Sequence, residues 1–142
     1  DWGRMNGRRQ MLRPAALLAC LAGLPAAAGD LALGRETFAG ACAACHGAEA
    51  RGDGPMAELI SIPVPDLTRI AARNGGSFPW LTVVHQIDGR TGLRGHGGPM
   101  PMFGALFAGD TAAADAPDGT PVITSARVLA LTDWLASIQV AE

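Results

Sequence analysis

The sequence predicts a small all-α domain of three to five helices joined by long Gly/Pro-rich loops. The chain has 142 residues, which suits one domain, and three of its segments repeat apolar residues with the period of a helix. Gly and Pro together contribute 29 residues. Aromatic residues make up only 5% of the chain and tyrosine is absent, so few bulky side chains are available for a core. We therefore expect a bound group to fill part of the interior.

Residues 1–28 are predicted to be an N-terminal signal peptide, and residues 29–142 a single domain. Arginines precede an apolar run over residues 15–24, and small residues then offer a cleavage site after Ala28. The run is shorter than the ~20 apolar residues that a membrane-spanning helix needs. This order of features predicts export to the periplasm, and a buried N-terminal helix is the structural alternative.

Two further alternatives concern the same segment. Met5 and Met11 are both possible translation starts, so residues 1–4 could be an upstream extension and not part of the signal. Cys20 leaves with the signal peptide, unless cleavage occurs next to it and the cysteine is lipidated. We expect membrane attachment only if Cys20 carries lipid or the signal stays uncleaved.

Removal of the signal peptide makes the chain acidic. Residues 29–142 hold 7 basic and 12 acidic side chains, a net charge of −5. Without a basic stripe, the domain is not expected to bind nucleic acid. An acidic surface suits a partner protein with a basic face.

The first predicted helix spans residues 31–45, with Gly34 and Phe38 one turn apart on one face. Its last residues belong to the pentapeptide Cys42-Ala-Ala-Cys45-His46, whose histidine directly follows the helix. A structural zinc site needs four ligands, and the sequence has no second cysteine pair. A redox dithiol belongs in a βαβ pattern, which the flanking sequence lacks.

The remaining interpretation of C-x-x-C-H is covalent attachment of c-type haem. Two thiols on one helical turn can each bond one haem vinyl group, and His46 then points its imidazole at the iron. Cys42 and Cys45 are therefore the predicted attachment sites and His46 the first axial iron ligand. We expect one haem c, because the motif occurs once.

Between the motif and the last helix, the sequence predicts a loop that contains Met56 and then a further helix. Ser77 is expected to cap a helix that runs through Trp80 and ends near Gly89. In this helix His85 is assigned to ordinary packing, and Met56, in the loop before it, is assigned to core filling.

The segment RGHGGPMPMFG, residues 94–104, predicts the second axial ligand. Its glycines and prolines predict an extended loop, and Pro101 biases Met100 away from the helical region. A thioether is a familiar partner of histidine on haem iron. We predict Met100 as the ligand, and His96 and Met102 are its rivals in the same loop.

The last predicted helix begins after Thr124 or Ser125, either of which can cap it. Its apolar stripe consists of Val128, Leu131, Leu135 and Ile138. The periodicity predicts a helix packed on the core along that stripe.

Over residues 31–140 the sequence resembles the class I (mono-haem) cytochrome c family. The resemblance rests on C-x-x-C-H, on Gly52-Asp53-Gly54-Pro55 and on the M-P-x-F-G element from Met100 to Gly104. It implies a cytochrome c-like fold around the covalent haem, in which Pro55 offers its carbonyl to the His46 imidazole.

The resemblance also bears on how the helices meet and on the partners. It implies that the first helix crosses the last, with Gly34 beneath Leu131 or Trp134. It implies redox partners such as an oxidase, reductase or dehydrogenase. Residues 105–121 depart from the family pattern as a long polar insertion without an assigned role.

The sequence therefore predicts an electron-transfer protein and not an enzyme. An iron bound by both His46 and Met100 has no open position for bond chemistry, and no set of catalytic side chains accompanies the motif. The expected protein is a monomeric one-electron carrier of a respiratory chain. The alternatives are a dedicated electron-accepting subunit of a dehydrogenase or oxidase, and a haem sensor or peroxidase with a displaceable sixth ligand.

Overall fold

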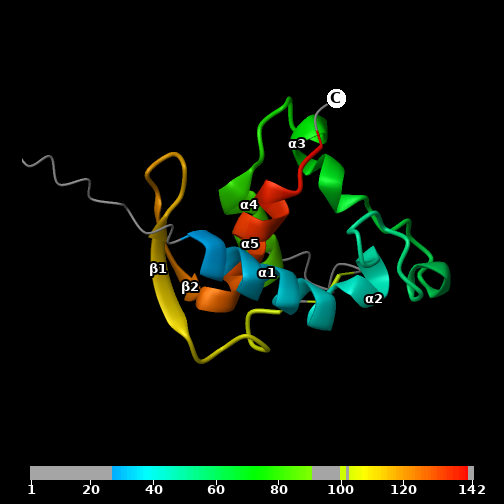
Figure 1. The fold of residues 1–142 in the computed structure, drawn as a ribbon, viewed down its shortest axis with the longest axis horizontal. Coiled ribbons are helices and arrows are strands. Elements are labelled where there is room, and N and C mark those ends of the chain that lie inside the picture. Colours follow the sequence, from blue (N-terminus) through cyan, green and yellow to red (C-terminus); the bar gives the residue numbers. More distant parts are fainter. Residues whose placement is uncertain (1–26, 91–99, 102, 141–142) are drawn as a thin grey trace, which may run out of the picture.

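The structure, a computed structural model, describes residues 27–90, 100–101 and 103–140 (Figure 1). Over these ranges it is mostly helical, as the sequence predicts, with one small sheet added. The elements in chain order are α1 (Ala27–Ala41), α2 (Ala43–His46), η1 (Ala57–Leu59), η2 (Leu67–Arg69), α3 (Ile70–Arg73), α4 (Trp80–Asp88), β1 (Thr111–Asp115), β2 (Pro121–Ser125) and α5 (Ala126–Ser137). No helix in these ranges is long and apolar enough to cross a membrane.

The crossing of α1 and α5 forms the centre of the core (Figure 1). A Cβ on Gly34 would collide with the carbonyl oxygen of Ala130 and would lie 2.7 Å from the Cβ of Trp134. Only glycine lets the helices approach this closely. The predicted contact with Trp134 is therefore confirmed, and the second contact is Ala130 and not Leu131. One turn after Gly34, Phe38 packs on Trp134 with the ring centroids 4.7 Å apart.

The predicted first helix is interrupted at its C-terminal end. The structure has α1 up to Ala41 and a separate turn, α2, from Ala43 to His46. Cys42 connects the two with φ −117° and ψ −32°, while its N–H still donates to the carbonyl of Phe38 at 2.8 Å. The regular helix is therefore interrupted at Cys42, and Ala43 to His46 form a turn of their own.

The helices α4 and α5 lie where predicted, but the predicted N-cap of α4 is wrong. Ser77 does not cap α4: Pro79 occupies the capping position without a side-chain hydrogen bond, and its fixed φ starts the helix at Trp80. At the other end Gly89 adopts φ 83°, which confirms the predicted stop. Ser125 caps α5, accepting from the N–H of Val128 at 3.2 Å.

The all-α prediction missed an antiparallel hairpin of β1 and β2, which begins in the insertion and continues beyond it to Ser125. Val122 and Thr124 are buried, so β2 turns alternate side chains toward the core. The strand β1 has the sequence TAAAD, whose low β-propensity does not predict a strand. Packing of the hairpin against α5 decides its structure (Figure 1).

Candidate haem site

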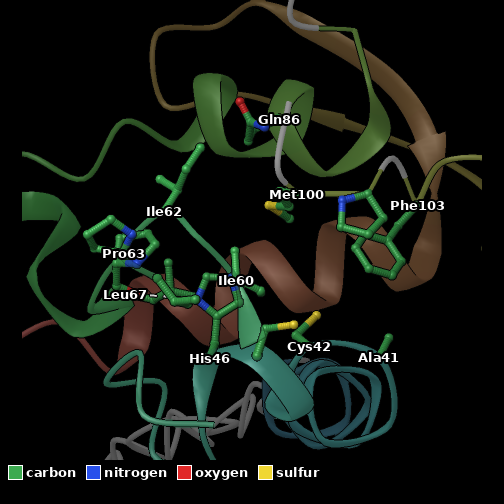
Figure 2. Close-up of a pocket in the computed structure, with 14 residues that line it drawn as sticks. Ala41, Cys42, His46, Ile60, Ile62, Pro63, Leu67, Gln86, Met100 and Phe103 are labelled. Carbon is green, nitrogen blue, oxygen red and sulfur yellow. Dashed lines mark hydrogen bonds between the residues drawn. The ribbon is translucent and has the colours of Figure 1, made fainter. Parts of the chain in front are cut away.

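The candidate site is a cavity of about 350 Å³ enclosed by α2, the loop over residues 60–67, α4 and the segment around Met100 (Figure 2). Its walls are almost entirely apolar. They include Ile60, Ile62, Pro63, Val64, Leu67 and Phe103. The aromatic-poor core thus leaves room for a large apolar group, as the composition predicted.

The turn α2 directs the motif cysteines toward this cavity. Cys42 and Cys45 both line it, and the N–H of His46 donates to the carbonyl of Cys42 at 2.9 Å. Residues three apart on a helical turn share one face, which is the spacing needed to reach two points of one planar group. Both thiols are free. Burial, with a smaller effect of the neighbouring Cys45, raises the pKa of Cys42 to about 11, so its thiol is uncharged near neutral pH.

The loop after the motif caps α2 with backbone amides. The N–H groups of Gly52, Gly54 and Met56 donate to the carbonyls of His46, Cys45 and Ala44, at 2.8, 3.1 and 2.8 Å. These are the carbonyls that a helix leaves without an internal partner at its C-terminal end. The Gly/Pro loop therefore fixes the orientation of the motif.

The Met56 side chain is 44% exposed, so its predicted role in core filling is wrong.

The imidazole of His46 is buried and oriented by a carbonyl. Its Nδ1 lies 3.3 Å from the carbonyl oxygen of Pro65. Because a carbonyl can only accept, Nδ1 carries the proton and Nε2 is left with a lone pair, the form in which histidine binds a metal. Burial lowers the pKa of His46 and the bond to Pro65 opposes this, so the neutral ring is favoured.

The predicted partner of His46, Pro55, was therefore wrong. Pro55 is exposed in the loop that caps α2, whereas Pro65 comes from the segment IPVP further along the chain. Local sequence gives no reason to choose the second of these prolines. The choice depends on how the loop from Ala50 to Leu67 closes, with the Leu67 N–H donating to the Ala50 carbonyl at 2.7 Å.

Gln139, at the end of the chain, holds the loop that contains Pro65. Its Nε2 donates to the carbonyls of Leu67 and Leu135, both at 2.8 Å, and its Oε1 accepts from the N–H of Ala71 at 2.8 Å. One amide side chain thus connects the end of α5 with η2 and α3. Sequence reasoning missed Gln139, because a lone glutamine carries no motif.

Met100 lies on the wall of the cavity opposite His46 (Figure 2). It is half-buried, and three residues later the N–H of Phe103 donates to the carbonyl of Ile87 at the end of α4, at 3.0 Å. The rival ligands His96 and Met102 lie outside the described residues. Gln86 of α4 also lines the cavity, although the sequence did not point to it.

The family model for cytochrome c matches residues 31–138. The chain belongs to the cytochrome c family. No curated protein and no solved structure matches it significantly. As a member of this family it is an electron-transfer haem protein with covalently bound haem c and iron.

The side chains that line the cavity of this cytochrome suit haem c. Two free thiols lie on one turn, the Nε2 lone pair of an imidazole is available beside them, and a thioether lines the opposite wall. The apolar walls match the flat faces of a porphyrin and keep water away from it. The cavity thus brings together side chains suited to attach, ligate and enclose a haem.

Proposed function

We propose that this cytochrome is a periplasmic one-electron carrier with a single haem, attached through Cys42 and Cys45 and ligated by His46 and Met100. The observation that carries the proposal is the placement of His46 and Met100 on opposite walls of one apolar cavity. Ligation of the haem iron by both residues would leave no open coordination position. Such a site transfers electrons without bond chemistry at the iron.

Each part of the chain has a defined task in this proposal. Cys42 and Cys45 would hold the haem through thioether bonds, each formed by addition of an S–H across one vinyl group, with the sulfur on one vinyl carbon and the hydrogen on the other. Once bound, the haem supplies one-electron chemistry through its ferric and ferrous states. The Nδ1–H of His46 donates a hydrogen bond to the carbonyl of Pro65. This bond holds the ring in position and raises the basicity of the imidazole as a ligand.

The walls and the second ligand favour outer-sphere electron transfer. Apolar residues exclude water and lower the local dielectric, which restricts reorganisation when the charge changes. A methionine thioether raises the reduction potential relative to a second imidazole. The acidic domain, with its net charge of −5 over residues 29–142, suits transient docking to a basic partner surface.

The absorption spectrum of the ferric holoprotein tests the ligation. We expect a low-spin spectrum with the methionine-to-iron charge-transfer band, which Met100→Ala abolishes and Met102→Ala leaves intact. A high-spin spectrum in the unmodified protein would overturn the proposal and favour a sensor or peroxidase with a displaceable ligand. Recovery of a stable complex with one dehydrogenase or oxidase would instead favour a dedicated subunit.

Haem number and location need a separate measurement. The full chain, expressed in bacteria that attach c-type haem, should appear in the periplasmic fraction with the mass of residues 29–142 plus one haem. A product that keeps residues 1–28, carries lipid on Cys20 or lacks haem would contradict the corresponding part of the proposal.

A further inference from the structure

The segment that follows Met100 is seated directly on the last turn of α4. The N–H of Phe103 donates to the carbonyl of Ile87 at 3.0 Å. A Cβ on Gly104 would collide with the carbonyl oxygen of Asp88 and would lie 2.5 Å from its Oδ1. The side chain and backbone of Asp88 therefore form the surface on which this segment rests.

Arg90 lies immediately after this turn and bridges two contacts. Its Nε is 2.6 Å from Oδ2 of Asp88, and its Nη2 donates to the carbonyl of Ile123 in β2 at 2.5 Å. Its backbone N–H donates to the carbonyl of His85 at 2.8 Å, which anchors it to α4. One guanidinium thus links the end of α4, the Met100 segment through Asp88, and the hairpin.

The Asp88 carboxylate depends on this arginine. The side chain of Asp88 is 12% exposed, and its Oδ2 has no hydrogen-bond partner of suitable geometry within the described part of the chain. The charge of Arg90 therefore compensates its burial. A buried charge that loses its partner is strongly unfavourable, so without Arg90 the carboxylate would turn toward water and leave Gly104.

We propose that Arg90 is a positioning residue that keeps Met100 on the haem iron by holding Asp88 beneath Gly104. This inference rests on the proposed ligation by Met100. The iron-bound and dissociated states of Met100 differ in whether its segment is seated on α4, so Arg90 stabilises the bound state alone. Loss of Arg90 raises the population of the dissociated state.

Imidazole is the probe, because it binds ferric iron only where Met100 has left. Wild type, Arg90→Gln and Arg90→Lys are titrated as holoproteins, with Arg127→Gln as the matched control. Arg127 is exposed on α5 and makes no ion pair with any described residue. We expect about tenfold tighter apparent imidazole binding for Arg90→Gln, the effect of a ~1.4 kcal/mol shift in the Met100 equilibrium. Arg90→Lys should lie between it and wild type, and Arg127→Gln should match wild type.

Two further measurements separate positioning from general destabilisation. The Phe103 amide should exchange hydrogen faster in Arg90→Gln than in the control. Adding Asp88→Asn to Arg90→Gln should restore most of the wild-type imidazole affinity, because no buried charge then needs a partner. If Arg90→Gln fails to yield holoprotein, Arg90→Lys and the double variant carry the same test.

The outcomes distinguish this inference from the proposal on which it rests. Wild-type protein without the methionine charge-transfer band would refute ligation by Met100 itself. A normal band with unchanged imidazole affinity in Arg90→Gln would overturn the role of Arg90 and leave the carrier proposal standing. A tenfold effect that Asp88→Asn does not reduce would likewise overturn it, because Arg90 would then act by another route.

Discussion

His46 and Met100 line the same cavity, but the segments that carry them are attached to the protein in different ways. On the His46 side, three loop amides cap α2 and the imidazole bonds to Pro65. Gln139 then fastens the segment beyond Pro65 with two hydrogen bonds, to Leu67 and Ala71, and forms a third with Leu135 of α5. The three bonds that cap α2 join backbone groups, which do not change rotamer.

The Met100 side is attached through few contacts in the described residues. The Phe103 N–H bonds to Ile87, Gly104 rests on Asp88, and Arg90 supports Asp88 from an exposed position. The aromatic rings of Phe103 and Phe107 stack with centroids 5.7 Å apart. Side-chain contacts near solvent open more readily than a capped helical turn. Ligand exchange should therefore begin at Met100, while His46 stays in place.

The largest expected effect comes from breaking the His46 side. His46→Ala should prevent accumulation of holoprotein, because the haem would lose its proposed first ligand and the cavity of about 350 Å³ would stay open in the core. Binding restricted to the folded state stabilises that state, so the apoprotein should show low helicity and a broad thermal transition. Mass spectrometry and circular dichroism measure both effects. Cys20→Ala, in the predicted signal peptide, is the control and should leave haem content unchanged; a cooperative apoprotein transition at high temperature would contradict the expectation.

Changes at Met100 should alter the spectrum and potential without loss of haem. Met100→His should keep a low-spin iron and lower the potential, because imidazole donates more strongly than thioether. Met100→Ala should give a high-spin ferric form that binds cyanide readily and gains peroxidase activity. Redox titration and absorption spectroscopy report these results. If Met102→Ala removes the methionine band and Met100→Ala does not, the two assignments must be exchanged.

Gln139 should have a smaller effect, confined to stability. Gln139→Leu removes three hydrogen bonds and leaves the carbonyl of Leu67 and the N–H of Ala71 without this partner, which should cost about 1–3 kcal/mol. Denaturation of the ferric holoprotein measures the loss, and the methionine band should persist below the transition. Ser137→Ala, which removes an exposed bond to the Trp134 carbonyl, is the matched control and should change little. Equal losses in the two variants would show that Gln139 does not fasten this loop.

The sequence predicted the features that depend on neighbouring residues. C-x-x-C-H pointed to the cytochrome c family, which the family model confirms. The stop of α4 at Gly89 and the cap of α5 at Ser125 are also confirmed, since a positive φ and a capping hydroxyl are local requirements. Ligation by Met100 stays a prediction, although the structure brings this residue to the cavity of His46.

The features that the sequence did not predict depend on distant contacts. His46 and Pro65 are 19 positions apart, and Gln139 and Leu67 are 72 apart. No local pattern identifies such pairs, because loop closure and helix packing decide them. The hairpin was missed for the same reason: the alanines of β1 form a strand only because β2 and α5 lie beside them.

The smallest expected effect comes from Asp66, and it tests whether the loop around Pro65 depends on one contact or on several. Asp66, directly after Pro65, accepts hydrogen bonds from the hydroxyl and the N–H of Thr68 at 2.6 and 2.9 Å. These bonds, above all the one from the hydroxyl, lower the pKa of Asp66. A carboxylate with a lowered folded-state pKa stabilises the protein above its ordinary pKa, and this stabilisation is lost as pH falls through the folded value.

Asp66→Asn should therefore cost about 1 kcal/mol or less near neutral pH, because the cap is one of several contacts around Pro65. Its stability should converge with that of wild type in acid. Urea unfolding of both ferric holoproteins between about pH 3 and 7 measures this difference. Asp115→Asn, an exposed change in β1, controls for the loss of one charge. A difference that persists at the acid end would mean that Asp66 acts through its shape and not its charge, and a loss above about 2 kcal/mol at neutral pH would mean that the loop around Pro65 depends on this single cap.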